Sequence, residues 1–343
     1  MGVWKMKKKI RVLVVDDSIV FREAIIRGIG ADESIEVVAR ASDPFEARDR
    51  ILELEPDVMT CDIEMPKMNG IEFVRRLLPQ YSIPVIIVSS LSEAVFDAMD
   101  AGAVDFVAKP ADKSSGNIQI FIQELIAKIK IAAVSKVAPR NAATGGQMVY
   151  GTHFSANRII AMGASTGGTE ALYSILVQLP ADIPGIVIVQ HIPPMFSRMF
   201  SERLNNQTLL TVKEAEDGDY VENGKVLVAP GDRHMRVNRI GDRYRVEVFD
   251  GEKVNGHCPS VDVLFDSVAK KAGSDGIGII LTGMGYDGAK GLLGMRRKGA
   301  RTIGQDEKSC VVYGMPKVAY DIGAVEKQVS LSEVPQALMN VLK

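Results

Sequence analysis

The sequence lacks any hydrophobic run long enough to cross a membrane. A spanning helix needs about 20 apolar residues in succession, and no run in the 343 residues approaches that length. The basic start of the chain is followed by the apolar residues 12–15, which Asp16 and Asp17 interrupt at once. This run is too short for the apolar region of a secretory signal peptide. We therefore expect a protein that is neither inserted into a membrane nor exported.

Cysteine is also scarce. The three cysteines, Cys61, Cys258 and Cys310, are odd in number and far apart in the chain. This pattern is typical of reduced thiols rather than of a disulfide framework, and it contains no metal-finger spacing. The cysteines therefore predict a cytoplasmic location.

The chain has no excess of charge of either sign. It contains 41 Lys and Arg residues against 43 Asp and Glu residues, which gives a net charge of -2. A chain this close to neutral has no overall field that would hold nucleic acid or anionic lipid. Neither is an expected partner.

The composition is that of an ordinary globular protein, with 46% hydrophobic residues. The length of the chain favours two domains of roughly 150 residues each. In the first part of the chain, short β-branched runs alternate with amphipathic segments. The runs are residues 10–15, 35–39, 57–61, 84–88 and 104–107. Five buried runs joined by helices predict a doubly wound, five-stranded parallel α/β sheet.

A change of composition separates the two predicted domains. Residues 135–155 are mostly small or polar and show no periodicity, as is typical of a linker. The predicted divisions are a basic N-terminal extension (1–9), a first domain (10–134), the linker (135–155) and a second domain (156–343).

The second domain repeats the α/β pattern. Strands are predicted at residues 158–162, 185–190 and 277–281, and helices at 168–179 and from about 287. Residues 235–240 and 244–249 flank a short Gly-containing loop, which predicts an antiparallel hairpin. We therefore expect a parallel-sheet α/β domain with an antiparallel element.

Three carboxylates follow strands of the first domain. Asp16 and Asp17 come directly after the first strand, and Asp62 directly after the third. Because the carboxyl ends of neighbouring parallel strands form the ligand crevice of such a sheet, the three should converge. Their oxygens suit a hard cation such as Mg²⁺. Ser89 and Lys109 would lie at the same edge, where they could bind a phosphoryl group.

Four segments of this domain resemble a known family. They are residues 14–18 (VVDDS), 62–70 (DIEMPKMNG), 88–90 (VSS) and 109–110 (KP). They are similar to the receiver domain of two-component response regulators, which is a flavodoxin-like fold. The resemblance implies that Asp62 is the phosphoacceptor. The Mg²⁺ ligands that it implies are Asp16, Asp17, Asp62 and the backbone carbonyl of Glu64. The switch and phosphoryl-contact residues that it implies are Ser89, Phe106 and Lys109.

The second domain carries a serine at a glycine-rich turn. Residues 163–168 (GASTGG) follow a strand and precede a helix. A serine in such a turn is exposed for nucleophilic attack, and N–H groups at the helix start can stabilise an oxyanion. The turn could instead cradle a phosphate or a dinucleotide, although it fits the G-x-G-x-x-G pattern poorly. Ser165 is the candidate nucleophile.

His191 and Asp287 could complete a hydrolytic triad with Ser165. His191 lies at the end of the next strand and shares the carboxyl edge of the sheet with Ser165, which makes it the favoured base among four histidines. His257, next to Cys258, could border a cleft. Asp287 follows the strand at 277–281 and could accept a hydrogen bond from the imidazole. The order Ser, His, Asp differs from that of α/β-hydrolases, which argues against an ordinary lipase or esterase.

Five segments of the second domain also resemble a family. They are residues 163–168 (GASTGG), 190–194 (QHIPP), 229–232 (APGD), 257–262 (HCPSVD) and 281–288 (LTGMGYDG). They look like the catalytic domain of the CheB family of chemotaxis protein-glutamate methylesterases, so the resemblance covers nearly the entire chain. It implies the triad Ser165, His191 and Asp287, with the backbone N–H of Met284 as an oxyanion donor. Cys258 departs from the family pattern without touching the triad.

The resemblance implies a phosphorylation-activated ester hydrolase. Its substrates would be glutamate γ-methyl esters, and selected glutamines, on the cytoplasmic helices of methyl-accepting chemoreceptors. A chemotaxis histidine kinase would be the phosphodonor. Mg²⁺ would serve the receiver, and no cofactor is expected for the esterase site.

Two alternatives remain open. The second domain could only bind, for example to DNA, although the balance of charge disfavours this. It could also be a small-molecule esterase or amidase that uses the same triad.

Overall fold

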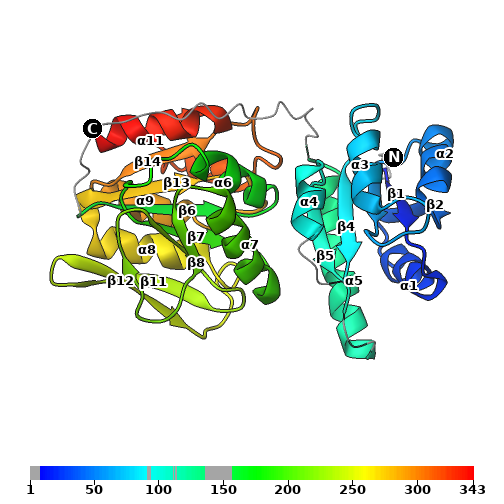
Figure 1. Cartoon of the computed structure of the whole chain (residues 1–343), viewed down its shortest axis with the longest axis horizontal. Coiled ribbons are helices and arrows are strands. Elements are labelled where there is room, and N and C mark those ends of the chain that lie inside the picture. The colour runs from blue at the N-terminus through cyan, green and yellow to red at the C-terminus, as the bar shows by residue number, and fades with distance from the viewer. Residues whose placement is uncertain (1–7, 91–93, 111, 113, 136–156) are drawn as a thin grey trace, which may run out of the picture. The chain divides into compact units, whose positions relative to one another are not determined.

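The computed structural model describes residues 8–90, 94–110, 112, 114–135 and 157–343. They form two compact units (Figure 1). Of the predicted linker, only Ser135 is among the described residues, and residues 1–7 of the predicted extension also lie outside them. Within the described ranges, no helix has both the length and the apolar character needed to span a membrane.

The first unit is a five-stranded parallel sheet with the order β2-β1-β3-β4-β5. Its strands are β1 (Ile10–Val15), β2 (Ile35–Ala41), β3 (Val58–Cys61), β4 (Val85–Ser89) and β5 (Asp105–Ala108). Its helices are α1 (Ile19–Gly30), α2 (Pro44–Leu54), α3 (Gly70–Leu77), α4 (Ala94–Asp100) and α5 (Ser115–Ala132). Every residue of β3 and β4 is buried, as expected for central strands covered on both faces. The prediction of a doubly wound, flavodoxin-like domain is confirmed.

Local sequence signals set the start of α2. The Asp43 carboxylate accepts hydrogen bonds from the amides of Phe45 and Glu46, at 2.9 and 3.0 Å. Pro44 occupies the first helical turn, where a missing N–H has no cost. These two local signals therefore fix the first residue of the helix.

The second unit is built on a seven-stranded parallel sheet with the order β15-β14-β13-β6-β7-β10-β8. Its strands are β6 (Ile159–Ala164), β7 (Ile186–Gln190), β8 (Thr211–Glu214), β10 (Lys225–Val228), β13 (Gly276–Ile280), β14 (Arg301–Gln305) and β15 (Lys327–Val329). Its helices are α6 (Gly168–Leu176), α7 (Pro194–Gln207), α8 (Val261–Lys271), α9 (Ala289–Arg297), α10 (Met315–Asp321) and α11 (Val334–Leu342), with 3-10 turns at Gly273–Asp275 and Leu331–Glu333.

The predicted hairpin is present in a separate antiparallel sheet. Strands β11 (His234–Ile240) and β12 (Arg243–Phe249) pair along their whole length, and β9 (Tyr220–Val221) adds to β12. The short strands β8 and β10, which the sequence pattern does not predict, instead extend the parallel sheet beyond β7. The second unit therefore has the expected α/β architecture with a wider main sheet.

Helices cover both faces of the main sheet. Ile159 and Ala161 of β6 belong to one core with residues of α8, α9 and the hairpin. Ile160 and Met162 alternate with them and are also fully buried, so they point into the opposite layer. Gly163 lets α8 approach closely, because a Cβ atom there would lie 2.2 Å from Val261 Cγ1. This contact brings the start of α8 to the carboxyl end of β6.

Candidate functional sites

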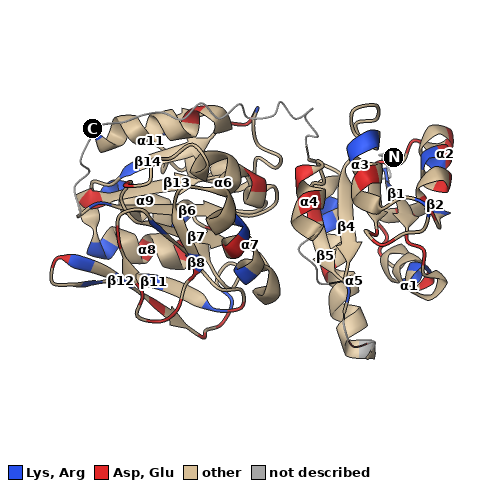
Figure 2. Cartoon of the chain, in the orientation of Figure 1, with Lys and Arg blue, Asp and Glu red and all other residues tan. Residues whose placement is uncertain are grey.

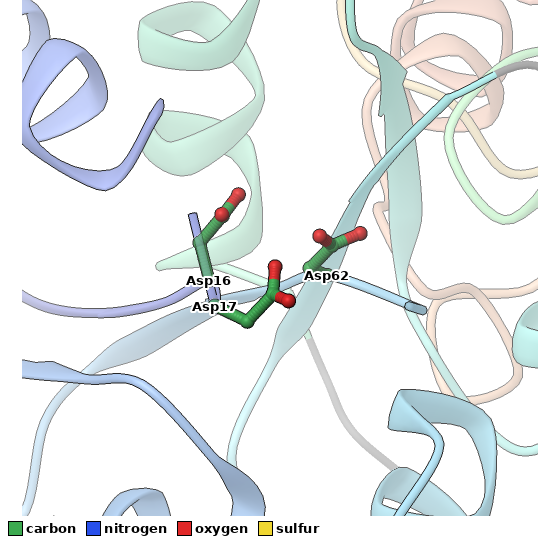
Figure 3. A group of neighbouring side chains, drawn as sticks. All are labelled: Asp16, Asp17 and Asp62. Carbon is green, nitrogen blue, oxygen red and sulfur yellow. The ribbon is translucent and has the colours of Figure 1, made fainter. Parts of the chain in front are cut away.

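Three aspartates meet at the carboxyl edge of the first sheet. Asp16 and Asp17 follow β1, and Asp62 follows its neighbour β3. Each offers a carboxylate oxygen, and these oxygens all lie within 4.8 Å of one another (Figure 3). Asp16 and Asp62 are buried, whereas Asp17 is exposed. A compact set of hard oxygen donors, open on one side, fits a divalent cation that also binds phosphate oxygens.

Lys109, which directly follows β5, completes this edge. Its Nζ lies 2.8 Å from Asp16 Oδ2 and 2.5 Å from Asp62 Oδ2. Burial alone would lower the pKa of Lys109, but the bonds to the two carboxylates outweigh it and raise that pKa. The ammonium group therefore stays charged beside Asp62, where it can offset negative charge.

The remaining predicted receiver residues lie on β4, on β5 and just after β3. Ser89 and Phe106 are buried on the neighbouring strands β4 and β5. Ser89 is paired with Ala108, which lies two residues after Phe106 in β5. Because alternate residues of a strand point to the same side, the side chains of Ser89 and Phe106 lie on the same face of the sheet. The amide of Glu64 lies 3.4 Å from Asp62 Oδ1. Ser89 and Glu64 are thus at the carboxyl edge that holds Asp62, whereas Phe106 lies earlier in β5.

In the second unit, Ser165 lies in the turn between β6 and α6. Its amide donates to Thr282 O at 3.0 Å, and its carbonyl accepts from the Gly168 amide at 2.7 Å. The buried Gln190 side chain donates to Ser165 O at 3.0 Å and to His191 O at 3.1 Å. One amide group therefore fixes the backbone at both residues.

His191 and Asp287 are in direct contact. The distance between His191 Nε2 and Asp287 Oδ2 is 2.9 Å, with only 8% and 1% of the side chains exposed. The other ring nitrogen, His191 Nδ1, is buried and has no hydrogen-bond partner among the described residues. His191 follows β7 and Ser165 follows β6, its neighbour in the sheet, although no hydrogen bond joins their side chains within the described structure. The imidazole is thus fixed by the acid and has one nitrogen left to accept a proton.

Asp287 accepts an unusual number of hydrogen bonds. Besides His191, the donors are Val261 N at 2.7 Å, Ser260 Oγ at 2.8 Å, Asn255 Nδ2 at 2.8 Å and Asp262 N at 3.3 Å. Burial alone would raise the pKa of Asp287, but the bonds from His191 and Asn255 outweigh it and hold that pKa below its usual range. Asp287 is therefore an ionised acceptor, as the acid of a triad must be.

The loop around Met284 lies against the serine turn. A Cβ atom at Gly283 would lie 2.7 Å from Ser165 Cβ, so the next residue begins within reach of the serine. Within the described part of the chain, no backbone carbonyl accepts a bond from the Met284 N–H. The loop can therefore present this N–H to a substrate oxygen.

Sequence reasoning missed three residues that hold Ser165, His191 or Asp287 in place. Gln190, Asn255 and Ser260 are not among the predicted site residues, and His257 is predicted only at a cleft border. Its ring stacks on His191, with centroids 3.7 Å apart. The Asn255–Gly256 dipeptide is a turn signal, and Ser260 caps α8. Both signals predict local structure, but neither predicts contact with Asp287.

Two arginines of the hairpin are paired with acids. Arg236 contacts Glu247 through two bonds, and Arg243 contacts Glu222 at 2.7 Å. Figure 2 shows both signs of charge on this element. Such pairs neutralise the charge that a nucleic-acid surface would need.

Comparison with known proteins gives two family matches. Residues 160–338 match the CheB methylesterase model, and residues 12–119 match the response regulator receiver domain model. The chain is 56% identical over 335 residues to "Protein-glutamate methylesterase/protein-glutamine glutaminase 2" of Syntrophomonas wolfei, covering 98% of both chains. It is 46% identical over 336 residues to "Protein-glutamate methylesterase/protein-glutamine glutaminase" of Salmonella typhimurium, covering 96% of both chains.

One solved structure supports the second unit. The CheB methylesterase catalytic domain of Thermotoga maritima superposes with a TM-score of 0.53 at 38% identity. It matches over 54% of this chain and 98% of its own length. The recognition made from the sequence motifs is confirmed.

Proposed function

Since this chain belongs to the CheB methylesterase family and carries a response regulator receiver domain, we propose that it is a phosphorylation-regulated protein-glutamate methylesterase and protein-glutamine glutaminase. The support is a likeness to curated relatives of that name along almost the full length of both chains. The reaction is hydrolysis of a γ-glutamyl methyl ester to glutamate and methanol, or of a glutamine side chain to glutamate and ammonia.

Ser165, His191 and Asp287 are proposed as the catalytic residues. Ser165 Oγ attacks the ester carbonyl while His191 Nδ1 takes its proton, because Nε2 is engaged by Asp287. The protonated imidazole then returns the proton to the leaving methoxide, and methanol departs. Water then attacks the acyl-enzyme while His191 takes one of its protons. His191 returns that proton to Ser165 Oγ as the bond to the serine breaks and glutamate leaves.

Two groups stabilise charge during these steps. The Asp287 carboxylate stabilises the imidazolium form of His191 and fixes its tautomer. The Met284 N–H is the proposed donor to the oxyanion that forms on the substrate carbonyl. The observation that carries the proposal is a buried His191 with one nitrogen on Asp287 and the other without a partner among the described residues, at the strand edge that holds Ser165.

In the receiver domain, Asp62 is the proposed phosphoacceptor. Its carboxylate would attack the phosphohistidine of a chemotaxis histidine kinase, so that the phosphoryl group passes from nitrogen to oxygen. The residues proposed to hold Mg²⁺ are Asp16, Asp17, Asp62 and the backbone carbonyl of Glu64. Mg²⁺, when bound, supplies positive charge that offsets the phosphoryl oxygens. Lys109 would contact the same oxygens, and Ser89 and Phe106 would respond to them as the switch pair.

The proposed partners are the cytoplasmic helices of methyl-accepting chemoreceptors and the kinase. The proposed organisation keeps a receiver over residues 10–134 and a catalytic domain over 156–343, in a cytoplasmic enzyme. Phosphorylation of the first domain is proposed to raise the activity of the second.

A competition between substrates tests this function against a general esterase. Methylated chemoreceptor membranes and a nitrophenyl ester are supplied to the full chain, and methanol and nitrophenol are measured. The proposal predicts a higher kcat/KM for the receptor methyl ester. A higher kcat/KM for the nitrophenyl ester would instead identify a small-molecule esterase.

A further inference from the structure

A tight turn outside the main sheet reaches the catalytic acid. Val254 and His257 exchange two backbone hydrogen bonds, of 2.9 and 3.0 Å. Between them, Asn255 and Gly256 have positive φ angles of 55° and 86°. Two central residues with positive φ are typical of a type I′ turn, which fixes the direction of the side chains that it carries.

The Asn255 amide bridges two buried carboxylates. Its Nδ2 lies 2.8 Å from Asp287 Oδ1 and 2.7 Å from Asp262 Oδ2. The amide has two N–H groups, one for each acceptor, and in the reverse orientation its oxygen would face two carboxylates. The nitrogen must therefore point at this pair.

The second carboxylate is itself fixed. Asp262 lies in the first turn of α8, is buried, and accepts a bond of 2.7 Å from the Gly291 amide of α9. Asn255 thus links Asp287 to Asp262, a residue that is held in place between α8 and α9. It also separates two negative groups that would otherwise face each other inside the protein.

The bridge acts on the oxygen that His191 does not use. Asp287 Oδ2 faces His191 Nε2 and also accepts from the Val261 amide, whereas Oδ1 accepts from Asn255 Nδ2, from Ser260 Oγ and, at 3.3 Å, from the Asp262 amide. The bonds to Oδ1 contribute to the rotation of the carboxylate about its bond to Cβ, and this rotation decides whether Oδ2 points at the imidazole.

We propose that Asn255 is a positioning residue of the hydrolytic site, whose amide holds Asp287 in the rotation that engages His191. This inference rests on the proposed function of the triad. Asn255 does not touch the reacting atoms, so its loss should lower kcat and leave KM nearly unchanged.

Two substitutions separate this role from a purely conformational one. Asn255→Gly fits the positive φ and removes the amide, whereas Asn255→Asp fits it nearly as well but adds a carboxylate. The proposal predicts that kcat falls about tenfold in Asn255→Gly. It predicts a loss of about 100-fold or more in Asn255→Asp at pH 8, where the new carboxylate repels Asp262 and Asp287.

A pH series gives a second readout. The carboxyl group that Asn255→Asp introduces can donate a hydrogen bond again once it is protonated, so the ratio of kcat in Asn255→Asp to kcat in Asn255→Gly should rise as the pH falls. The groups that face this position are Asp262, Asp287, Ser260, His191, His257 and Lys253. Asn206→Asp on the exposed face of α7 makes the same chemical change away from the site and should keep wild-type activity.

Methanol release from methylated receptor and the rate of Ser165 labelling by a fluorophosphonate are measured for each protein. Labelling needs an activated serine but no natural substrate. If the wild type is labelled but releases no methanol, the proposed substrate is refuted. The labelling rates of wild type, Asn255→Gly and Asn255→Asp then still test the role of Asn255. Equal rates for wild type and Asn255→Gly, or a faster Asn255→Asp than Asn255→Gly at pH 8, would overturn the inference.

Discussion

The imidazole rings of His191 and His257 stack face to face, with centroids 3.7 Å apart and planes inclined by 6°. Burial, together with the neighbouring His191, lowers the pKa of His257 from 6.5 to about 4. His257 is therefore a neutral ring at pH 7 that covers one face of the proposed base. A flat neutral neighbour restricts the tilt of His191 and excludes water from that face.

The stack predicts an effect of ring shape rather than of ring charge. His257→Phe keeps a flat ring on His191 and should retain most of the activity, whereas His257→Ala should lower kcat about tenfold, a loss of about 1.4 kcal/mol. Steady-state methanol release at pH 7.5 measures both. Equal losses in the two variants would contradict a stacking role.

The same residue predicts a pH dependence of stability. The unfolded chain binds a proton at His257 near pH 6.5, but the folded chain does so only near pH 4. Between these values the unfolded state binds more protons, so the free energy of unfolding of the second unit falls as the pH is lowered. The loss is at most about 1.4 kcal/mol per pH unit. Urea unfolding at pH 7 and pH 4.5 should show a smaller loss in His257→Phe, and an unchanged loss would count against this account.

Asp287→Asn should nearly abolish turnover. The new amide would place N–H donors opposite the donors Ser260 and Asn255, and it would no longer fix the His191 tautomer. A fall in kcat on the order of 10³-fold to 10⁴-fold is expected, as for the equivalent change in a serine protease. Stopped assays on the full chain measure it. Activity within tenfold of the wild type would show that another residue supplies the acid.

Gly163 predicts a packing effect on the site. An Ala side chain there would collide with Val261, which leads the α8 segment that binds Asp287. Gly163→Ala should lower the free energy of unfolding by about 1–3 kcal/mol and reduce activity. Gly294→Ala in α9 is the matched control, because its nearest neighbour would be 3.6 Å away. Chemical denaturation distinguishes the two, and equal stabilities would refute the steric argument.

Lys109→Ala should separate regulation from catalysis. Lys109 contacts Asp16 and Asp62 in the first unit, so its loss should abolish stimulation by a phosphodonor while the unstimulated rate of the second unit persists. Methanol release with and without the phosphodonor measures this. Full stimulation in the variant would exclude the proposed role.

Much of the fold is predictable because buried strands leave a continuous apolar signal. The five runs of the first unit and the strands β6, β7 and β13 are predicted in this way. Strands β8, β10, β14 and β15 are not predicted, because all four are short and each includes polar residues. Strands β8 and β15 are also partly exposed. Their place is decided by pairing with a neighbour and not by their own pattern.

Some residues of the candidate site are predictable from the sequence and others are not. Residues at strand ends, such as Ser165 and His191, are predictable because parallel strands share one edge. Asn255 and Ser260 come from a segment between the hairpin and α8, far from Asp287 in the chain. The close packing of α8 on Gly163 brings the Ser260 end of this segment to the acid.

The most direct test of the account is methanol release from methyl-labelled chemoreceptor membranes. Wild type, Ser165→Ala and Asp62→Asn are compared with and without a small phosphodonor and Mg²⁺. The account predicts release that requires Ser165 and that the phosphodonor stimulates in wild type but not in Asp62→Asn. Undiminished release by Ser165→Ala, or no release by wild type under any condition, would contradict it.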